Sequence, residues 1–340
     1  MKNVTLKDVA MKAGVSPSTV SRVVSDDSRI SEKTKQKVLK VMNELNYYPN
    51  SIARSLANKK TDTIGVIMPS YEEDIFMNPF FQEGLRGISL VTGKNSYDIL
   101  IATNHEGEKD VDVLKRVIKG NRVDGIILTR SNEKDESIKY LRESNFPFVL
   151  IGSCLEYDDI PSVDNDNEKA SYELTSLLIK KGRKKIAFIG GELHSVVIKN
   201  RFEGYKKALN DNNIKFNHEY LISDKFSEES GYKLTDKLLK LNDIPDSIIV
   251  ADDLMSLGAM KKIKEEKYKV PKDIMLASFN NSILAKYSNP SITSIDINSV
   301  QLGKRACEKL FNILNNNKKL ENNKEIVEYK IIERDSTKII

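Results

Sequence analysis

The chain has 340 residues, of which 39% are hydrophobic and 30% are charged, proportions that are ordinary for a globular protein. This length is enough for about two or three domains. No apolar run reaches the ~18 residues that a membrane-spanning helix needs, and the first residues lack the apolar core of a secretion signal, so we expect a cytoplasmic protein. Cys154 and Cys307 follow neither a CxxC nor a Cys/His spacing, which predicts two core thiols and excludes a disulfide framework or zinc site.

The net charge of +5 is unevenly distributed along the chain. Residues 1–60 contain 12 Lys and Arg against 5 Asp and Glu, a net charge of +7, whereas the other 280 residues have a net charge of −2. A basic head on a nearly neutral body is typical of nucleic-acid binding. On charge alone, a basic tail with no nucleic-acid partner is the alternative.

Three short helices are predicted in this basic head. Thr5 begins a capping box for the first helix, and Gly14 ends it. Ser16 caps a second helix whose first residue is Pro17, and Ser31 caps a third. Two short helices that are joined by a glycine turn and braced by a third form a helix-turn-helix unit, although three helices that merely pack together would have the same pattern.

The second predicted helix has a small polar outer face. Ser18 and Ser21 allow the helix to enter a major groove closely, and Arg22 can then reach the O6 and N7 atoms of guanine. After the third helix, Asn50 caps a further helix of about seven residues, which is too short to be stable alone in water. Paired with a second subunit, this helix can lie in a minor groove with Leu56 as a wedge between bases; a plain linker is the alternative.

From Thr63 onward, short apolar runs alternate with amphipathic helices. Strands are predicted at residues 63–69, 97–103, 123–129, 147–152, 184–191, 220–223, 247–251, 274–279, 291–297 and 327–332. Helices are predicted at residues 81–92, 109–119, 134–144, 167–181, 201–212, 229–241, 254–267 and 300–314. Apolar strands separated by helices indicate an α/β body with parallel sheets covered on both faces.

The strands fall into two series that divide near Ser162, which predicts two similar lobes. We expect lobe 1 at about residues 62–162 and 291–322, and lobe 2 at about residues 163–290 and 323–340. Ligands of such sheets bind beyond the carboxyl ends of the strands. The candidates there are polar residues and glycines that suit a ligand rich in hydroxyls: Ser70, Tyr71, Arg130, Gly190, Gly191, Asp252, Asp253, Asn280 and Asn281.

Four stretches resemble the lactose/galactose-repressor family of bacterial regulators: "VTLKDVAMKAGVSPSTVSRVV", "SEKTKQKV", "ELNYYPNSIARSLA" and "TIGVIMPS". The resemblance spans the chain. It implies a helix-turn-helix DNA-binding domain at residues 1–48, a hinge helix and linker at 49–61, and an effector-binding and dimerisation body, periplasmic-binding-protein-like in fold, at 62–340.

The resemblance also implies roles for individual residues of the head. Bases of an operator would be read by Pro17, Ser18 and Arg22, with Leu6 and Arg29 as helpers. Phosphate contacts are implied for Thr5, Ser16, Thr19, Ser21, Ser31 and Asn50. In the hinge helix, Ala53 would allow its close pairing with a second copy, and Leu56 would open the central base step.

In the body, the resemblance implies an effector site. The family's effector arginine matches Arg201, and its polar pairs match Asp252-Asp253 and Asn280-Asn281; Ser70 and Phe80 are further candidates. Asp252 stands where many relatives have Asn, and Asn280 where many have Asp, which disfavours a lactose- or galactose-like ligand. The stretches "NPFF", "VDNDN" and "AFIGG" resemble most the maltose-operon repressors within this family, which implies maltose or maltodextrin.

The resemblance therefore implies a homodimeric repressor of carbohydrate-utilisation genes that binds a palindromic operator, sits on the nucleoid when bound, and is released by a sugar. The alternative is a global carbon-catabolite regulator that responds to a phosphorylated partner protein. A transport-type sugar receptor is disfavoured by the basic head. An enzyme is disfavoured because the three histidines form no metal-spaced cluster and no GxSxG, P-loop or HExxH is present, so we expect no cofactor, metal or membrane partner.

Overall fold

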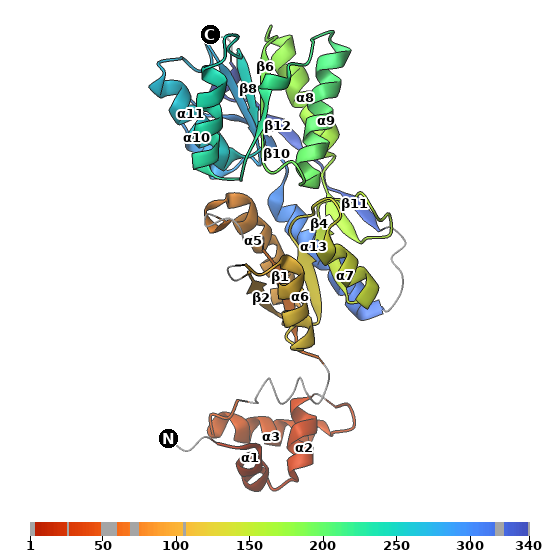
Figure 1. Ribbon diagram of the computed structural model, residues 1–340. Helices are drawn as coiled ribbons and strands as arrows, with labels where there is room; N and C mark the ends of the chain where they lie inside the picture. Colours follow the sequence, from red (N-terminus) through yellow and green to blue (C-terminus); the bar gives the residue numbers. More distant parts are fainter. Residues whose placement is uncertain are drawn as a thin grey trace. The chain divides into compact units, whose positions relative to one another are not determined.

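The computed structural model describes residues 4–25, 27–48, 60–68, 75–104, 107–316 and 323–338. The chain forms two compact units, a head at Met1–Asp62 and a body at Thr63–Ile340 (Figure 1). The predicted hinge helix lies outside the described residues, and so do five candidate site residues: Asn50, Ala53, Leu56, Ser70 and Tyr71. Within the described part of the chain, no helix has both the length and the apolar character needed to cross a membrane.

The head consists of three helices, α1 (Leu6–Ala13), α2 (Pro17–Val24) and α3 (Glu32–Glu44), around a core that includes Val9, Val20 and Val38. The predicted caps are confirmed. Thr5 and the third residue of α1 form a capping box, and the hydroxyls of Ser16 and Ser31 each accept a backbone N–H of the helix that follows. Gly14 ends α1 at a φ of 62°, a left-handed conformation that glycine adopts without strain.

The body is built on two sheets of six strands each. The first contains β1 (Thr63–Ile67), β2 (Asp98–Ala102), β3 (Gly125–Leu128), β4 (Phe148–Ile151), β5 (Ser162–Asp164) and β11 (Lys324–Ile326). The second contains β6 (Ile186–Gly190), β7 (Leu221–Ser223), β8 (Ser247–Val250), β9 (Met275–Phe279), β10 (Thr293–Asp296) and β12 (Lys330–Ile332). The strand orders are β11-β5-β4-β3-β1-β2 and β12-β10-β9-β8-β6-β7, and every pair is parallel except β10 with β12.

Helices cover both faces of each sheet, as predicted (Figure 1). The first lobe has α5 (Pro79–Lys94), α6 (Asp110–Lys119), α7 (Glu136–Ser144) and α13 (Ser299–Asn316). The second has α8 (Asn167–Lys180), α9 (Val196–Asp211), α10 (Glu228–Leu239), α11 (Asp253–Glu265) and α12 (Ile283–Tyr287). Three short 3₁₀ helices complete the described elements, at Ile75–Met77, His218–Tyr220 and Asp335–Thr337.

Successive residues of the strands point into opposite layers, and both layers are apolar. In β3, Ile127 packs in the same core as α5 and α13, whereas Ile126 and Leu128 pack in the core formed with α6 and α7. The central strands are buried along their whole length for this reason. Cys154 and Cys307 are both buried free thiols, as predicted.

Three predictions about the lobe boundaries are wrong. The strand predicted at 291–297 is assigned to lobe 1 by the sequence, but the strand that forms there, β10, pairs in the second sheet with β9, its neighbour along the chain. The segment after 323 was expected in lobe 2, but β11 pairs with β5 in the first sheet. Because β5 itself also belongs to the first sheet, the chain enters the second lobe only after Asp164. The predictions that α13 packs in the first lobe and that β12 pairs in the second are confirmed.

Candidate nucleic-acid interface and ligand cleft

The outer face of α2 is polar, small and open to solvent. Pro17, Ser18, Ser21 and Arg22 are exposed, while Val20 on the opposite face is buried in the head core. The Ser16 hydroxyl lies 2.7 Å from that of Ser18 and 2.9 Å from that of Thr19. The amino end of α2 therefore presents three hydrogen-bonding hydroxyls together, and both phosphate oxygens and base edges accept bonds from such groups.

The two arginines of this region have different surroundings. Arg22 is exposed and pairs with no carboxylate among the described residues. Arg29 is held by Asp27, with Nη2 and Oδ2 at 2.6 Å and Nε and Oδ1 at 2.9 Å, and this guanidinium keeps the pKa of Asp27 well below its usual range. Among the described residues, therefore, Arg29 is held in an ion pair whereas Arg22 is not.

The other candidate DNA contacts of the head are engaged locally. Leu6 is half-buried against the head core. The Thr5 hydroxyl lies 2.7 Å from Asp8 Oδ2, and the Ser31 hydroxyl lies 2.9 Å from that of Thr34. Thr5 and Ser31 are exposed and lie at helix amino termini, where the unsatisfied backbone N–H groups and the helix dipole also favour a phosphate.

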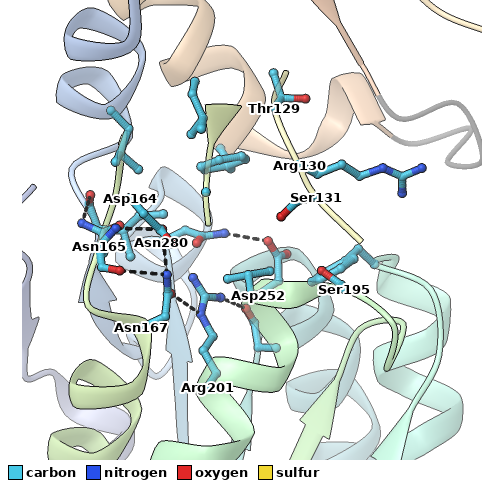
Figure 2. Close-up of a pocket in the computed structure, with 18 of the residues that line it drawn as sticks. Thr129, Arg130, Ser131, Asp164, Asn165, Asn167, Ser195, Arg201, Asp252 and Asn280 are labelled. Carbon is cyan, nitrogen blue, oxygen red and sulfur yellow. Dashed lines mark hydrogen bonds between the residues drawn. The ribbon is translucent and has the colours of Figure 1, made fainter. Parts of the chain in front are cut away.

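The body has a cleft at the carboxyl ends of both sets of strands, where the sequence predicts it. Residues from the two lobes line it together (Figure 2). Four of the five predicted effector residues are in this lining: Phe80, Arg201, Asp252 and Asn280. The lining also contains Arg130 from the wider set of strand-end candidates, and the fifth predicted residue, Ser70, is not described.

Arg201 is the buried cation of the cleft. Its Nε donates to Asn167 Oδ1 at 2.9 Å, its Nη1 donates to the Ala251 carbonyl oxygen at 2.6 Å, and its guanidinium lies 4.0 Å from the centre of the Phe279 ring. Burial lowers its pKa to about 10, so it stays charged at neutral pH. Nη2 has no hydrogen-bond partner among the described residues, which leaves it as a donor for a ligand.

The carboxylate of Asp252 is the main acceptor of the cleft. Asp252 is 2% exposed, and burial raises its pKa. Its Oδ1 caps α11 by accepting the Leu254 N–H at 2.7 Å, and its Oδ2 accepts from Asn280 Nδ2 at 2.6 Å and from Asn78 Nδ2 at 2.9 Å. Because Asn78 belongs to the first lobe and Asp252 to the second, this last hydrogen bond joins the lobes across the cleft.

The second members of the two predicted polar pairs are not in the cleft lining. Asp253 is fully buried within the second lobe, where it accepts from the hydroxyl of Ser294 at 2.9 Å and from the Ser282 N–H at 2.6 Å. Asn281 instead accepts from Arg334. Within each pair, therefore, one residue faces the cleft and the other turns into the second lobe.

One predicted boundary near the site is wrong as well. Arg201 was expected to open its helix, but α9 begins five residues earlier, at Val196, so Arg201 lies in the second turn. The helix begins early because "VVIKN" continues the helical apolar pattern, with Val196 and Ile198 fully buried. Arg201 therefore points into the cleft from a rigid helix rather than from a helix end.

Several lining residues were not predicted from the sequence. They are Asn78, Thr129, Ser131, Ser153, Asp164, Asn165, Asn167, Glu192, Ser195 and Phe226, together with apolar neighbours. Asn78 precedes a proline at the first position of α5, a helix-start pattern that the sequence shows but that gives no sign of a contact with the other lobe. Asp164 lies in the same lining as Arg201, and burial raises its pKa to about 6, although the Asn165 N–H donates to it at 2.8 Å and the Arg201 charge acts in the opposite direction.

The chain passes between the lobes in three crossover segments, and the side chain of Asn165 is hydrogen-bonded to two of them from the third. The chain crosses after β5, after β10 and after β11. Asn165, on the first crossover, donates from Nδ2 to the carbonyl oxygens of Ile297 at 3.1 Å and Val327 at 2.8 Å, on the second and third. Asn165 is 4% exposed, so these buried carbonyl groups depend on it for their hydrogen bonds.

Comparison with known proteins shows to which protein family this chain is related. Residues 5–50 match the bacterial regulatory proteins of the lacI family, and residues 175–337 match the periplasmic binding protein-like domain. The transcriptional regulator MalR of Streptococcus pneumoniae is 41% identical over 97% of this chain and 99% of its own. The chain belongs to the LacI family. It is thus a DNA-binding transcriptional regulator with a LacI-type head and a periplasmic-binding-protein-like body.

Other members of the LacI family are similar over most of the chain. Catabolite control protein A of Priestia megaterium is 35% identical over 86% of this chain and 87% of its own. The lac repressor dimer bound to operator and the anti-inducer ONPF has a TM-score of 0.85 at 27% identity, covering 99% of each chain. A complex of the regulator CelR with cellobiose has a TM-score of 0.76 at 26% identity, covering 98% of this chain and all of that one.

Proposed function

We propose that this LacI-family regulator is a homodimeric repressor whose affinity for a palindromic operator is lowered by maltose or a maltodextrin. The head at residues 1–48 reads the operator, residues 49–61 form the hinge, and the body at 62–340 binds the sugar and dimerises. Base contacts are assigned to Pro17, Ser18 and Arg22. A twofold dimer suits a palindrome because each half-site then receives one head.

The observation that carries the sugar proposal is the composition of the cleft. It combines a fixed guanidinium with a free Nη2, amide and carboxylate groups from Asn280 and Asp252, and the aromatic ring of Phe80. A sugar needs this set, since each hydroxyl both donates and accepts and its apolar face packs against a ring. The similarity to a cellobiose-bound regulator supports a disaccharide. The similarity to a probable maltose operon repressor MalR of Staphylococcus aureus, 29% identical over 82% of this chain with a TM-score of 0.73, supports maltose.

A ligand that binds between the two lobes can control DNA binding by changing how the lobes are arranged. A sugar that binds one arrangement of the lobes more tightly shifts their equilibrium toward it, and only by that difference in affinity. A coupling of about 1–3 kcal/mol gives on the order of 5- to 150-fold control of operator affinity. Ordering of the hinge on the operator supplies an element whose folding the lobes can favour or oppose.

The test is calorimetric titration of the full chain with maltose, maltotriose, cellobiose and lactose. We expect maltose or maltotriose to bind more tightly than the other two. Arg201→Ala should weaken binding by about 1.5–3 kcal/mol because a charged hydrogen bond to the ligand is lost. Arg142→Ala is the control, since Arg142 pairs with Asp159 on the surface outside the cleft lining.

A global catabolite regulator remains the second candidate because of the similarity to catabolite control protein A. It predicts a different outcome of the same titration. None of the sugars would bind, and operator affinity would rise on addition of a phosphorylated partner protein instead. Binding of maltose that depends on Arg201 rules against this second candidate.

A further inference from the structure

A second pocket lies at the end of the second sheet that is opposite to the cleft. It is formed by the chain just before β6, just before β9 and just before β10, so it lies at the amino ends of these strands. Its volume is about 780 Å³. The lining consists of Lys181, Arg183, Lys264, Tyr268, Lys269, Val270, Pro271, Lys272, Met275, Pro290 and Lys338. None of these residues lines the cleft.

The lining of this pocket is strongly cationic. Six of its eleven residues are Lys or Arg, and none is acidic. Lys181 pairs with Glu333 at 2.6 Å and Lys338 with Asp335 at 2.9 Å, so two of the six charges are balanced from outside the lining. The other four are not paired with any described carboxylate within 4.0 Å: Arg183, Lys264, Lys269 and Lys272.

Two of these unbalanced cations are held in place by backbone. Arg183 Nη2 donates to the carbonyl oxygens of Pro271 at 2.7 Å and Lys272 at 3.1 Å, and Lys264 Nζ donates to the Asn289 carbonyl oxygen. Carbonyl groups orient a cation without neutralising it. Asp273, which follows the loop, accepts the Lys269 backbone N–H at 2.7 Å rather than its ammonium.

The rest of the lining is apolar and includes flat groups. Tyr268 is half-buried, Pro271 and Met275 are buried, and Pro290 completes this surface. The pocket thus combines several cations that pair with no described carboxylate with an apolar surface formed by Tyr268, Pro271, Met275 and Pro290. This combination suits a ligand that has both a chain of phosphates and a flat ring. A neutral sugar would leave the cations without counter-charges.

We propose that this pocket binds a small polyphosphorylated molecule, such as a nucleoside polyphosphate, as a second ligand of the regulator. Lys269 and Lys272 contact the phosphates, and Arg183 fixes the loop that carries Lys272. The proposal is independent of the sugar site because the two sites share no lining residue. The basic stretches "KKGRKK" (180–185) and "KEEKYKVPK" (264–272) contribute to the lining of this pocket. Neither DNA reading nor sugar binding explains why these stretches are basic.

The experiment is calorimetric titration of the full chain with adenosine triphosphate and with inorganic tripolyphosphate at physiological salt. The double variant Lys269→Glu and Lys272→Glu reverses two exposed charges of the pocket. The matched control is Lys119→Glu and Lys237→Glu, with the same change in net charge at exposed residues outside the pocket. The control also corrects for binding of anions to the basic head, and circular dichroism confirms that both variants fold.

We expect the pocket variant to bind at least one of the two anions about tenfold more weakly than the control variant does, because two charge-assisted contacts become repulsive. Tighter binding of the nucleotide than of tripolyphosphate assigns the ring to the apolar floor, and equal binding assigns the site to the phosphate chain alone. Absence of binding, or equal losses in both variants, overturns the proposal. A selective loss of duplex DNA affinity in the pocket variant, with no effect on the small anions, overturns it too.

Discussion

Asn78 and Asp252 are 174 positions apart in the sequence, and a hydrogen bond of 2.9 Å joins them across the cleft. Asn78 acts in two ways at once, since its Oδ1 also accepts the Phe80 N–H at 3.0 Å and so caps α5. Asp252 likewise caps α11. Each lobe thus begins a helix with the residue that reaches across to the other lobe, and the contact depends directly on the separation of the lobes.

Replacement of Asn78 separates these two roles. Asn78→Ser retains a capping oxygen but loses the amide that reaches Asp252, while Asn78→Asp retains the cap and brings a second carboxylate to a buried one. The arrangement of the lobes in which Asn78 reaches Asp252 should be destabilised, relative to an arrangement with the lobes apart, by about 1–3 kcal/mol in the serine variant. The destabilisation should be larger in the aspartate variant. Hydrogen exchange of the amides at 252–256 measures this opening, and equal exchange in all three proteins would show that the contact does not hold the lobes.

Asn165 is expected to stabilise the body by hydrogen-bonding the three crossover segments to one another. Asn165→Ala leaves two buried carbonyl groups without their donor, and each such group costs about 1–3 kcal/mol. The free energy of unfolding of the body should fall accordingly in urea. Asn212→Ala is the matched control, because Asn212 is exposed and its Nδ2 donates to a carbonyl of its own helix. A loss no larger than in the control would mean that the crossovers do not need this side chain.

Asp164 gives the body a defined pH dependence. Its pKa is raised from 3.8 to about 6, so between these values the native carboxyl keeps a proton that the unfolded chain has released. The native state then binds more protons, and the free energy of unfolding falls as the pH rises from about 4 to about 6. Asp164→Asn cannot titrate and should lack this part of the decrease. Identical pH profiles for the two proteins would place the pKa of Asp164 near its ordinary value.

Arg22 is expected to contribute sequence specificity rather than general affinity. Arg22→Ala should weaken binding to the cognate operator by about 1–3 kcal/mol and change binding to random duplex little. Arg29→Ala is the comparison, because Arg29 is already paired with Asp27 and should lose less. Fluorescence anisotropy at fixed salt measures both affinities. An equal loss on cognate and random DNA would assign Arg22 to the phosphate backbone.

Local features of this chain could be predicted well from the sequence. The caps at Thr5, Ser16 and Ser31 depend on contacts within one turn of helix, and they are confirmed. Ten of the twelve described strands were also predicted at overlapping bounds, whereas the short strands β5 and β11 were not predicted. These elements are encoded by neighbours in the sequence, through periodicity and helix capping.

Features that depend on distant residues could not be predicted. β10 was placed in the wrong lobe because an apolar run does not reveal which strand it pairs with. Asp252 was predicted as the effector residue of its pair and lies in the cleft lining, but the local sequence does not show that Asp253 is instead buried within the second lobe, where it accepts hydrogen bonds from Ser282 and Ser294. Asn78 was missed because a contact with residue 252 leaves no trace in the residues around 78.

The central claim is that one chain reads an operator and releases it when the cleft is filled by a maltose-type sugar. The most direct measurement is the anisotropy of a duplex that the full chain itself selects from a random pool, titrated with protein in the presence and absence of maltose or maltotriose. We predict a palindromic duplex whose affinity falls on the order of 5- to 150-fold with the sugar, and an Arg201→Ala variant that binds DNA but is not released. Operator affinity that is the same with and without every maltodextrin tried would contradict the account.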